Sequence, residues 1–294
     1  MTDLLARIRS PELAGRPTLL IPVGSTEQHG PHLPLGMDTL IAQAVAHGAA
    51  EAMTKTGVDV LVAPALAYGS SGEHQHFAGT VSIGSEALRH FLVELVRSAG
   101  SWTGRCVFVN GHGGNVSAVV AAVSRLRYER HDVGWAPCVP AATGENALLD
   151  SHAGRVETSL ALALAPDDVR LERAERGAIE PLAALLPRIR LGGVVSVSAN
   201  GVLGDPRGAS AQEGAKLLQS MVTDVTSSVL AWAPDGQGRL QNIDGSGEQR
   251  SDEQPSDGQR SDGERSGKQR SGRQQDLEQQ ALDPRSDERP SVVT

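Results

Sequence analysis

The stretch TLLIPV at residues 18–23, followed by GSTEQHGPHLPLGMD at residues 24–38, decides how this chain is expected to fold. The first six residues are a short apolar run bounded by turn residues, which is typical of a buried strand. Side chains alternate along an extended segment, so Glu27 and His29 can point to the same side. Carboxylate and imidazole together suit Zn²⁺, Fe²⁺ or Mn²⁺ better than Ca²⁺ or Mg²⁺. Glu27, His29 and the later Asp38 are therefore candidate metal ligands, and a hydrogen-bonded polar turn is the alternative.

A second polar loop follows another short apolar run. CVFV at residues 106–109 predicts a buried strand, and NGHGGN at residues 110–115 follows it directly. The next apolar segment, residues 116–123, is rich in Ala and Val and predicts a helix. Because open α/β sheets place ligands at the carboxyl ends of their strands, His112 lies where a ligand-binding residue is expected.

A third polar segment, SHAGRVETSL at residues 151–160, opens an apolar helical run. If Glu157 lies in the first helical turn and His152 in the loop before it, both side chains can face one cavity. The alternative for Glu157 is a favourable acid at a helix N-terminus, an effect of about 0.3–1 kcal/mol. That alternative explains Glu157 by itself, but it does not explain all three polar segments together.

These motifs resemble those of the creatininase family of metal-dependent amidohydrolases. The similar blocks occur in family order between residues 24 and 210: GSxEQHGPHLPLxxD at 24–38, YGxSxEH at 68–74 with GTxS at 79–82, NGHGGN at 110–115, HAGxxETS at 152–159 and GDPxxAS at 204–210. The resemblance implies a three-layer α/β/α fold with a mostly parallel central sheet. It also implies a site for two divalent ions (Zn²⁺ and/or Fe²⁺, with Mn²⁺ as the further candidate). The implied ligands are Glu27, His29, Asp38 and His112, with Asp38 bridging the two ions.

The chain departs from creatininase itself in one loop. Creatininase has a glutamate ligand two residues after its equivalent of His112, and this chain has Gly114 there. We expect Glu157 to be the replacement metal ligand, because it is the acidic member of the HAGxxETS block. His152 is the candidate catalytic residue, as donor of a proton to the leaving amine, since imidazole titrates near physiological pH. A supporting or capping histidine is the alternative.

The order of the predicted elements agrees with this fold class. Strands are predicted at 18–23, 58–63, 105–109, 133–138 and 194–197, and helices at 38–55, 85–100, 116–129, 157–165 and 210–232. Such alternation favours a mostly parallel sheet covered by helices on both faces. We therefore expect one α/β domain over residues 1–232. Residues 233–294 are expected to be a disordered polar tail, because they hold too few apolar side chains to offset the entropy lost on ordering.

Three functions are considered. The YGxSxEH block and the following Gln75 most resemble a branch of the family formed by the peptidases of the mycofactocin system. That resemblance implies hydrolysis of a ribosomally made precursor peptide, upstream of its modified C-terminal Val-Tyr unit. The alternatives are a small-molecule amidohydrolase acting on creatinine or a formamide, and a non-catalytic metal-binding partner protein.

Composition limits the partners and the compartment. The formal net charge is −8, and the charges of the tail are mixed in sign, so no nucleic-acid partner is expected. The absence of a signal pattern and of a long apolar run predicts a cytoplasmic protein without a membrane partner. Cys106 and Cys138 both fall in predicted strands and do not indicate a disulfide. The family resemblance implies a homo-oligomer.

Overall fold

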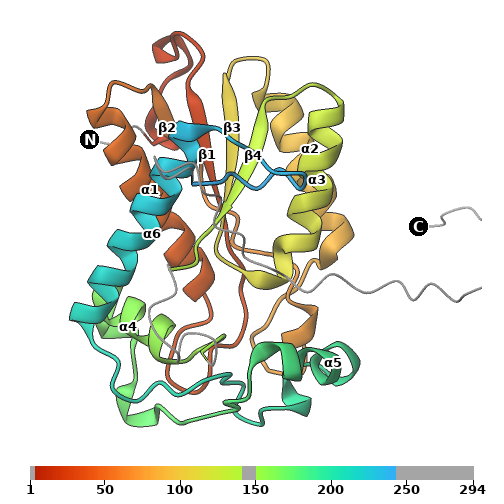
Figure 1. Cartoon of the computed structure of the whole chain (residues 1–294), viewed down its shortest axis with the longest axis vertical. Coiled ribbons are helices and arrows are strands. Elements are labelled where there is room, and N and C mark those ends of the chain that lie inside the picture. Colours follow the sequence, from red (N-terminus) through yellow and green to blue (C-terminus); the bar gives the residue numbers. More distant parts are fainter. Residues whose placement is uncertain (1–3, 141–149, 243–294) are drawn as a thin grey trace, which may run out of the picture. The chain divides into compact units, whose positions relative to one another are not determined.

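The computed structural model describes residues 4–140 and 150–242, and its centre is a parallel four-stranded sheet in the order β2-β1-β3-β4 (Figure 1). The strands are β1 (Thr18–Val23), β2 (Val60–Val62), β3 (Arg105–Asn110) and β4 (Val133–Pro137). In the register of β1 and β3, Val23 lies opposite Asn110. The loops that follow these two strands therefore leave the sheet at the same edge.

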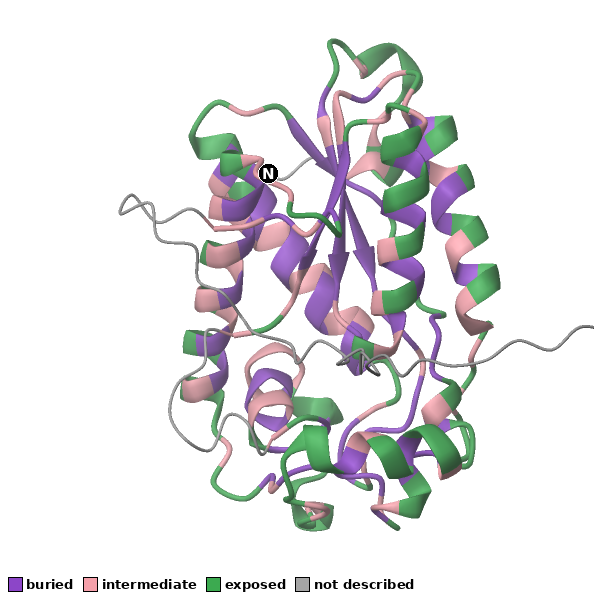
Figure 2. Ribbon diagram, turned by 45° about the vertical axis from the view of Figure 1, so that its right-hand side comes forward, coloured by how far each residue is buried: buried purple, intermediate pink, exposed green. Residues whose placement is uncertain are grey.

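Helices cover both faces of this sheet. Figure 1 shows α1 (Met37–Lys55) and α6 (Ala211–Ala231) on one side, and α2 (Gly84–Ala99) and α3 (Val116–Tyr128) on the other. Along β1, Leu20 packs into the core under α1 and α6, whereas Leu19 and Ile21 pack into the core under α2 and α3. Because both faces are buried, the strands are continuous apolar runs (Figure 2). The predicted three-layer α/β/α fold is confirmed.

Two more helices, α4 (Arg155–Leu164) and α5 (Leu182–Gly192), follow the sheet in the sequence. The sequence predicted α4 but not α5, which contains Pro187, a residue that normally disfavours a helix interior. Single 3₁₀ turns occupy Leu5–Arg7, Ser10–Glu12, Gly72–His74, Gly113–Asn115, Pro166–Asp168, Leu171–Arg173 and Val194–Ser196.

The strand predicted at 194–197 is wrong. This segment is the 3₁₀ turn Val194–Ser196, and Val194 is buried in a small cluster with Leu185 and Ile189 of α5. The apolar residues of 194–197 thus find burial against a helix rather than in the sheet. An apolar run alone does not distinguish these two environments.

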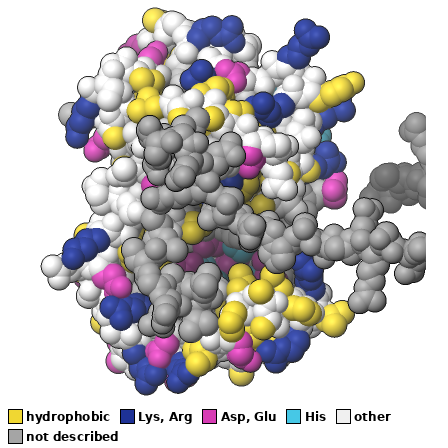
Figure 3. All heavy atoms as spheres, in the orientation of Figure 1, with side chains coloured by type: hydrophobic (Ala, Val, Ile, Leu, Met, Phe, Trp, Pro, Cys, Tyr) yellow, Lys and Arg dark blue, Asp and Glu magenta, His cyan; other side chains and the backbone are white. Residues whose placement is uncertain are grey.

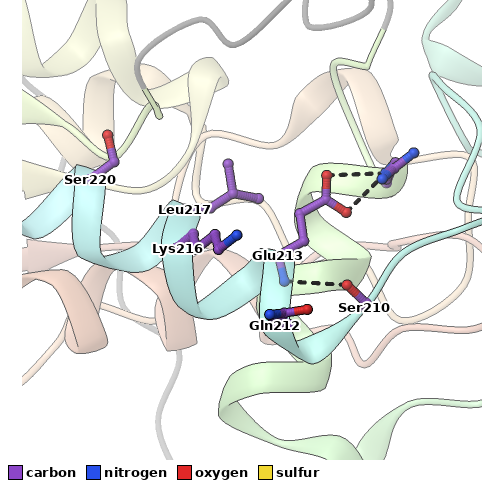
Figure 4. A pocket seen from close by; sticks show the side chains of 7 residues that line it. Ser210, Gln212, Glu213, Lys216, Leu217 and Ser220 are labelled. Atoms are coloured by element: carbon purple, nitrogen blue, oxygen red, sulfur yellow. Dashed lines mark hydrogen bonds and ion pairs between the residues drawn. The ribbon is translucent and has the colours of Figure 1, made fainter.

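The N-terminus of α6 follows its sequence signal in part. The Ser210 hydroxyl accepts a hydrogen bond from the Glu213 backbone N–H at 3.2 Å, as a capping residue should (Figure 4). The Glu213 carboxylate does not return to the backbone of Ser210, as it would in a complete capping box. It accepts hydrogen bonds from Arg155 at 2.9 Å and from the Ser159 hydroxyl at 3.0 Å instead, and so ties α6 to α4. Arg155, Ser210 and Glu213 also line a pocket of about 370 Å³ (Figure 4).

The ordered chain continues beyond Trp232, where the sequence predicted the start of a disordered tail. The Leu240 backbone N–H donates to the Trp135 carbonyl of β4 at 2.9 Å, and the Leu240 side chain is buried in the core beside Gly134. Residues 233–242 are therefore packed against the sheet, because Leu240 supplies the apolar anchor that this polar segment otherwise lacks. The rest of the predicted tail, residues 243–294, lies outside the described residues.

Two further expectations concern the chain as a whole. Cys106 and Cys138 are free thiols, in agreement with the sequence. Among the described residues, none of the helices combines the length and apolar character needed to cross a membrane.

Candidate metal centre

All six residues predicted for the site come together at the carboxyl edge of the sheet. Glu27 and His29 lie in the loop after β1, and Asp38 in the first turn of α1. His112 follows β3, while His152 precedes α4 and Glu157 lies in its first turn. In the space-filling view, acidic and histidine side chains lie at the bottom of a hollow in the surface (Figure 3).

Asp38 lies between two histidines. Its Oδ1 atom is 3.3 Å from Nε2 of His29, and its Oδ2 atom is 3.4 Å from Nδ1 of His112. The Ser25 hydroxyl donates to Oδ2 at 2.6 Å and holds the carboxylate in this orientation. The two oxygens of one buried carboxylate thus point to two different imidazoles, as a ligand shared by two ions would.

Glu27 is fully buried, and neither of its carboxylate oxygens accepts a hydrogen bond. Oε2 lies 3.2 Å from Nε2 of His112, and Oε1 lies 3.4 Å from Nε2 of His74 and 3.7 Å from Nδ1 of His152. A carboxylate buried without compensation costs several kcal/mol, by order of magnitude. The surroundings of Glu27 therefore favour a proton or a cation at this carboxyl group.

Glu157 completes the side of the centre around His29. Its Oε2 atom lies 3.7 Å from Nε2 of His29 and accepts the Ala153 backbone N–H at 2.6 Å. Ala153 has φ of +52°, in the left-handed region, which turns its N–H toward this carboxylate. Helix N-terminal electrostatics alone would not bring Glu157 to His29.

Backbone carbonyls orient three of the histidines. Nδ1 of His29 contacts the Glu27 carbonyl at 3.1 Å, Nε2 of His112 contacts the Ser70 carbonyl at 3.2 Å, and Nε2 of His152 contacts the Gln28 carbonyl at 2.8 Å. A carbonyl only accepts, so in the neutral histidine that nitrogen carries the proton and the opposite nitrogen has a lone pair. The opposite nitrogens face the carboxylates. Histidines that bind metal ions are usually oriented in this way.

The pKa values reflect this crowding of acceptors. Burial, followed by the proximity of Asp38, raises the pKa of Glu27 to about 7. Burial also raises the pKa of Glu157 to about 7, although His29 opposes this rise. For His29, burial lowers the pKa, but Asp38 and the two glutamates outweigh it and raise the pKa to about 10. The ion-free centre thus retains protons that cations would displace.

The described residues contain three groups whose donor atoms could hold an ion. They are Glu27, Asp38 and His112; His29, Asp38 and Glu157; and Glu27, His29 and His152. Asp38 belongs to the first two groups. The unpartnered atoms at the centre, Oε1 and Oε2 of Glu27 and Nε2 of His29, are ligand atoms of these groups. The donor set of carboxylates and imidazoles therefore fits divalent transition-metal ions.

The structure adds three residues that the sequence did not assign to this centre. His74, the last residue of the YGxSxEH block, is buried against Glu27. Gln28 contacts both His74 and His152. Glu73 places Oε1 at 3.6 Å from Nε2 of His112. Their positions in the EQH and EH motifs, beside predicted site residues, were the available sequence signal.

Gly114 explains how Glu73 reaches His112. A Cβ atom at residue 114 would lie 2.4 Å from Oε1 of Glu73 and 2.4 Å from Nε2 of His112. The Glu73 carboxyl thus occupies space that a side chain at residue 114 would need. The loss of an acid from this loop makes room for an acid from the 3₁₀ turn Gly72–His74.

His32, His47, His90 and His131 have other surroundings. His32 is buried and contacts the Thr158 hydroxyl at 2.9 Å. His47 and His90 lie in α1 and α2, and His131 follows α3. The three candidate ion-binding groups among the described residues include none of these four histidines.

A parallel α/β/α sheet with buried carboxylates and imidazoles at its carboxyl edge is compatible with the class of metal-dependent hydrolases. The family model described as creatininase, creatinine amidohydrolase, matches residues 6–229. The chain belongs to the creatininase family, and it is a hydrolase of C–N bonds.

Relatives of known name and structure agree with this assignment. The chain is 53% identical over 226 residues to the mycofactocin precursor peptide peptidase of Mycolicibacterium smegmatis, covering 76% of this chain and 89% of that protein. A solved structure described as creatininase Mn has a TM-score of 0.66 and 27% identity, covering 80% of this chain and all of that one. A creatininase variant of Zn-Zn type has a TM-score of 0.64 and 26% identity, covering 80% and 100% of the two chains.

Proposed function

We propose that this protein is a metal-dependent peptidase of mycofactocin biosynthesis, which releases the modified C-terminal Val-Tyr unit from a ribosomally made precursor peptide. The observation that carries the proposal of a two-ion hydrolase is Asp38, whose two oxygens face His29 and His112. The peptide substrate is supported by the 53% identity to the M. smegmatis peptidase, compared with 27% to the creatininase described with Mn.

The metal centre in this proposal has one ion held by Glu27, Asp38 and His112, and a second held by His29, Asp38 and Glu157. Zn²⁺, Fe²⁺ and Mn²⁺ all suit this mixture of carboxylates and imidazoles. Such ions supply a hydroxide at neutral pH and polarise the scissile carbonyl. Glu157 here supplies the acidic ligand that the loop at Gly114 does not provide. The distance of 3.7 Å between Oε2 of Glu157 and Nε2 of His29 supports that role.

His152 is the proposed catalytic residue for proton transfer. Its Nε2–H donates to the Gln28 carbonyl, so its Nδ1 atom is free on the side of Glu27. Burial lowers the pKa of His152 well below its ordinary value, and the neighbouring His29 and His74 lower it further. In this proposal His152 starts the reaction neutral, accepts at Nδ1 a proton from the attacking water, and then gives that proton to the leaving amine. This refines the role expected from sequence, in which His152 acted only as a donor.

The same geometry indicates where the substrate would bind. The acidic and histidine side chains lie at the bottom of a hollow (Figure 3), and in this proposal the C-terminal part of the precursor peptide binds there. We include in the proposal a cytoplasmic location and a homo-oligomeric assembly, both of which rest on the resemblance to the family.

The test is a direct assay of the full-length, metal-loaded chain. The protein is incubated with the modified precursor peptide, and mass spectrometry follows release of the C-terminal fragment. The Asp38→Asn variant is the inactive control, and Asp168→Asn, at an exposed position of the 3₁₀ turn Pro166–Asp168, is the matched surface control. Release by the wild type and its loss in Asp38→Asn supports the proposal. Turnover of creatinine or a formamide without peptide cleavage would replace it with a small-molecule function, and metal retention without any turnover would favour a non-catalytic role.

A further inference from the structure

Gln28 lies between the candidate ligands Glu27 and His29 in the sequence, but its side chain points to a different set of partners. The side chain is 5% exposed, and its Oε1 atom accepts the Gly30 backbone N–H at 2.9 Å. Its Nε2 atom lies 2.8 Å from Nδ1 of His74, 3.0 Å from Nε2 of His152 and 3.1 Å from the Gly201 carbonyl. One buried amide therefore contacts His74 and His152, two histidines that lie near Glu27 and are not among the proposed metal ligands.

The number of protons at this amide resolves which contacts are hydrogen bonds. The amide nitrogen has two N–H groups for three neighbouring atoms. Nε2 of His152 also lies 2.8 Å from the Gln28 backbone carbonyl, which can only accept. His152 must therefore carry its proton on Nε2, or two lone pairs would face each other there. The two N–H groups of Gln28 are then left for the Gly201 carbonyl and Nδ1 of His74.

With these hydrogen bonds, His74 presents an N–H group to Glu27, whereas His152 presents a nitrogen lone pair. Because Nδ1 of His74 accepts from Gln28, the proton of neutral His74 lies on Nε2, which is 3.4 Å from Oε1 of Glu27. His152 presents its bare Nδ1 atom to the same oxygen at 3.7 Å. One carboxylate oxygen thus faces an N–H on one side and a lone pair on the other.

The backbone around Gln28 holds the amide in this position. Gly201 has φ of +80°, and a Cβ atom added there would lie 2.0 Å from Oε1 of Gln28. The loop at Gly201 therefore packs directly on the amide. With both N–H groups and Oε1 in hydrogen bonds, reversal of the amide would place its oxygen against the Gly201 carbonyl.

We infer that Gln28 is a positioning residue that sets the tautomers of two histidines: its side chain keeps the His74 proton on Nε2, and its backbone carbonyl keeps the His152 proton on Nε2. His74 then orients Glu27 by an N–H contact, and His152 keeps Nδ1 available to receive a proton. The assignment of tautomers stands on the hydrogen bonds alone, and only its kinetic consequence rests on the proposed function.

The experiment compares the full-length wild type with Gln28→Glu, in which a carboxylate of nearly the same shape can accept but not donate. Gln219→Glu, the same replacement at an exposed position of α6, is the matched control. Nitrogen-15 NMR of the imidazole rings in the metal-free proteins reports which nitrogen carries the proton. A His74→Gln variant identifies the His74 signals by their loss.

In the wild type and in Gln219→Glu, His74 should be protonated on Nε2 and bare at Nδ1. In Gln28→Glu, the proton of His74 should move to Nδ1. After metal loading, kcat should fall about 10–100-fold in Gln28→Glu, the range for residues that orient a metal centre, with a smaller change in KM. If Gln28→Glu does not fold, Gln28→Ala gives the same comparison, with both His74 tautomers populated.

A wild-type His74 with its proton on Nδ1 would overturn the inference. So would an unchanged His74 tautomer together with wild-type kcat in Gln28→Glu. Failure of the wild type to cleave the peptide would refute the proposed function instead, because the NMR measurement needs neither substrate nor metal.

Discussion

Replacing Gly114 with alanine tests how closely Glu73, His112 and the backbone pack at the metal centre. The added Cβ atom would lie 2.4 Å from Oε1 of Glu73, Nε2 of His112 and the Ser70 carbonyl oxygen. Ordinary van der Waals contact begins at 3.4 Å, so each contact is about 1 Å too short. Glu73 is partly exposed and can move away. The Ser70 carbonyl belongs to the backbone and His112 is held by its hydrogen bond, so neither can move freely.

The neighbouring Gly113 provides the control. A Cβ atom there would have no neighbour within 4 Å, although both glycines belong to the same 3₁₀ turn. We expect Gly114→Ala to lower the free energy of unfolding by about 1–3 kcal/mol, as overpacking does. Gly113→Ala should be neutral or stabilising by about 0.4–1 kcal/mol, because alanine restricts the unfolded chain.

Urea unfolding of the metal-free proteins, followed by circular dichroism, measures this difference. Metal content after loading is the second measurement, since displacement of His112 should also weaken the ion held by Glu27, Asp38 and His112. If the two alanine variants differ in stability by less than about 0.5 kcal/mol, the spread of neutral surface changes, the packing argument at Gly114 is wrong.

Three further predictions follow from the centre and the fold. Glu157→Gln should reduce bound metal from two ions to one per chain, whereas Glu73→Gln should retain two. Mass spectrometry of metals measures both variants. Full metal occupancy in Glu157→Gln would show that Glu157 is not a metal ligand. Glu27 and Glu157 have pKa values of about 7 without ions, so above that pH they are ready to bind and below it a proton must leave first. His29, with a pKa raised to about 10, must also lose a proton before it binds an ion. Apparent Zn²⁺ affinity in chelator competition should therefore fall as the pH drops below 10 and fall more steeply, by about a further tenfold per carboxyl for each pH unit, below 7; a flat profile would contradict these pKa values. Leu240→Ala should cost about 2–5 kcal/mol in urea unfolding, because its side chain is 3% exposed in the core, whereas a polar tail would show no effect.

Local pattern accounts for most of the fold. The predicted strand at 18–23 coincides with β1, and the predicted helix at 38–55 differs from α1 only by its first residue. Both lie in strongly apolar segments with clear ends, where burial leaves little choice of structure. The segments that failed, 194–197 and 233–242, depend on distant partners: Val194 packs on α5, and Leu240 packs beside β4. No local pattern contains that information.

The candidate site divides in the same way. The sequence by itself determined the chemistry of Glu27, His29 and Asp38 and the loops that carry them, because parallel strands bring their carboxyl ends to one edge. Only the tertiary structure decided that Asp38 faces two histidines, that Glu73 fills the space beside Gly114, and that Gln28 lies between His74 and His152. Those contacts join residues far apart in the chain. The physical reason is that residue type sets what a side chain can bind, whereas proton positions and shared ligands depend on contacts of a few ångströms that only the packed chain creates.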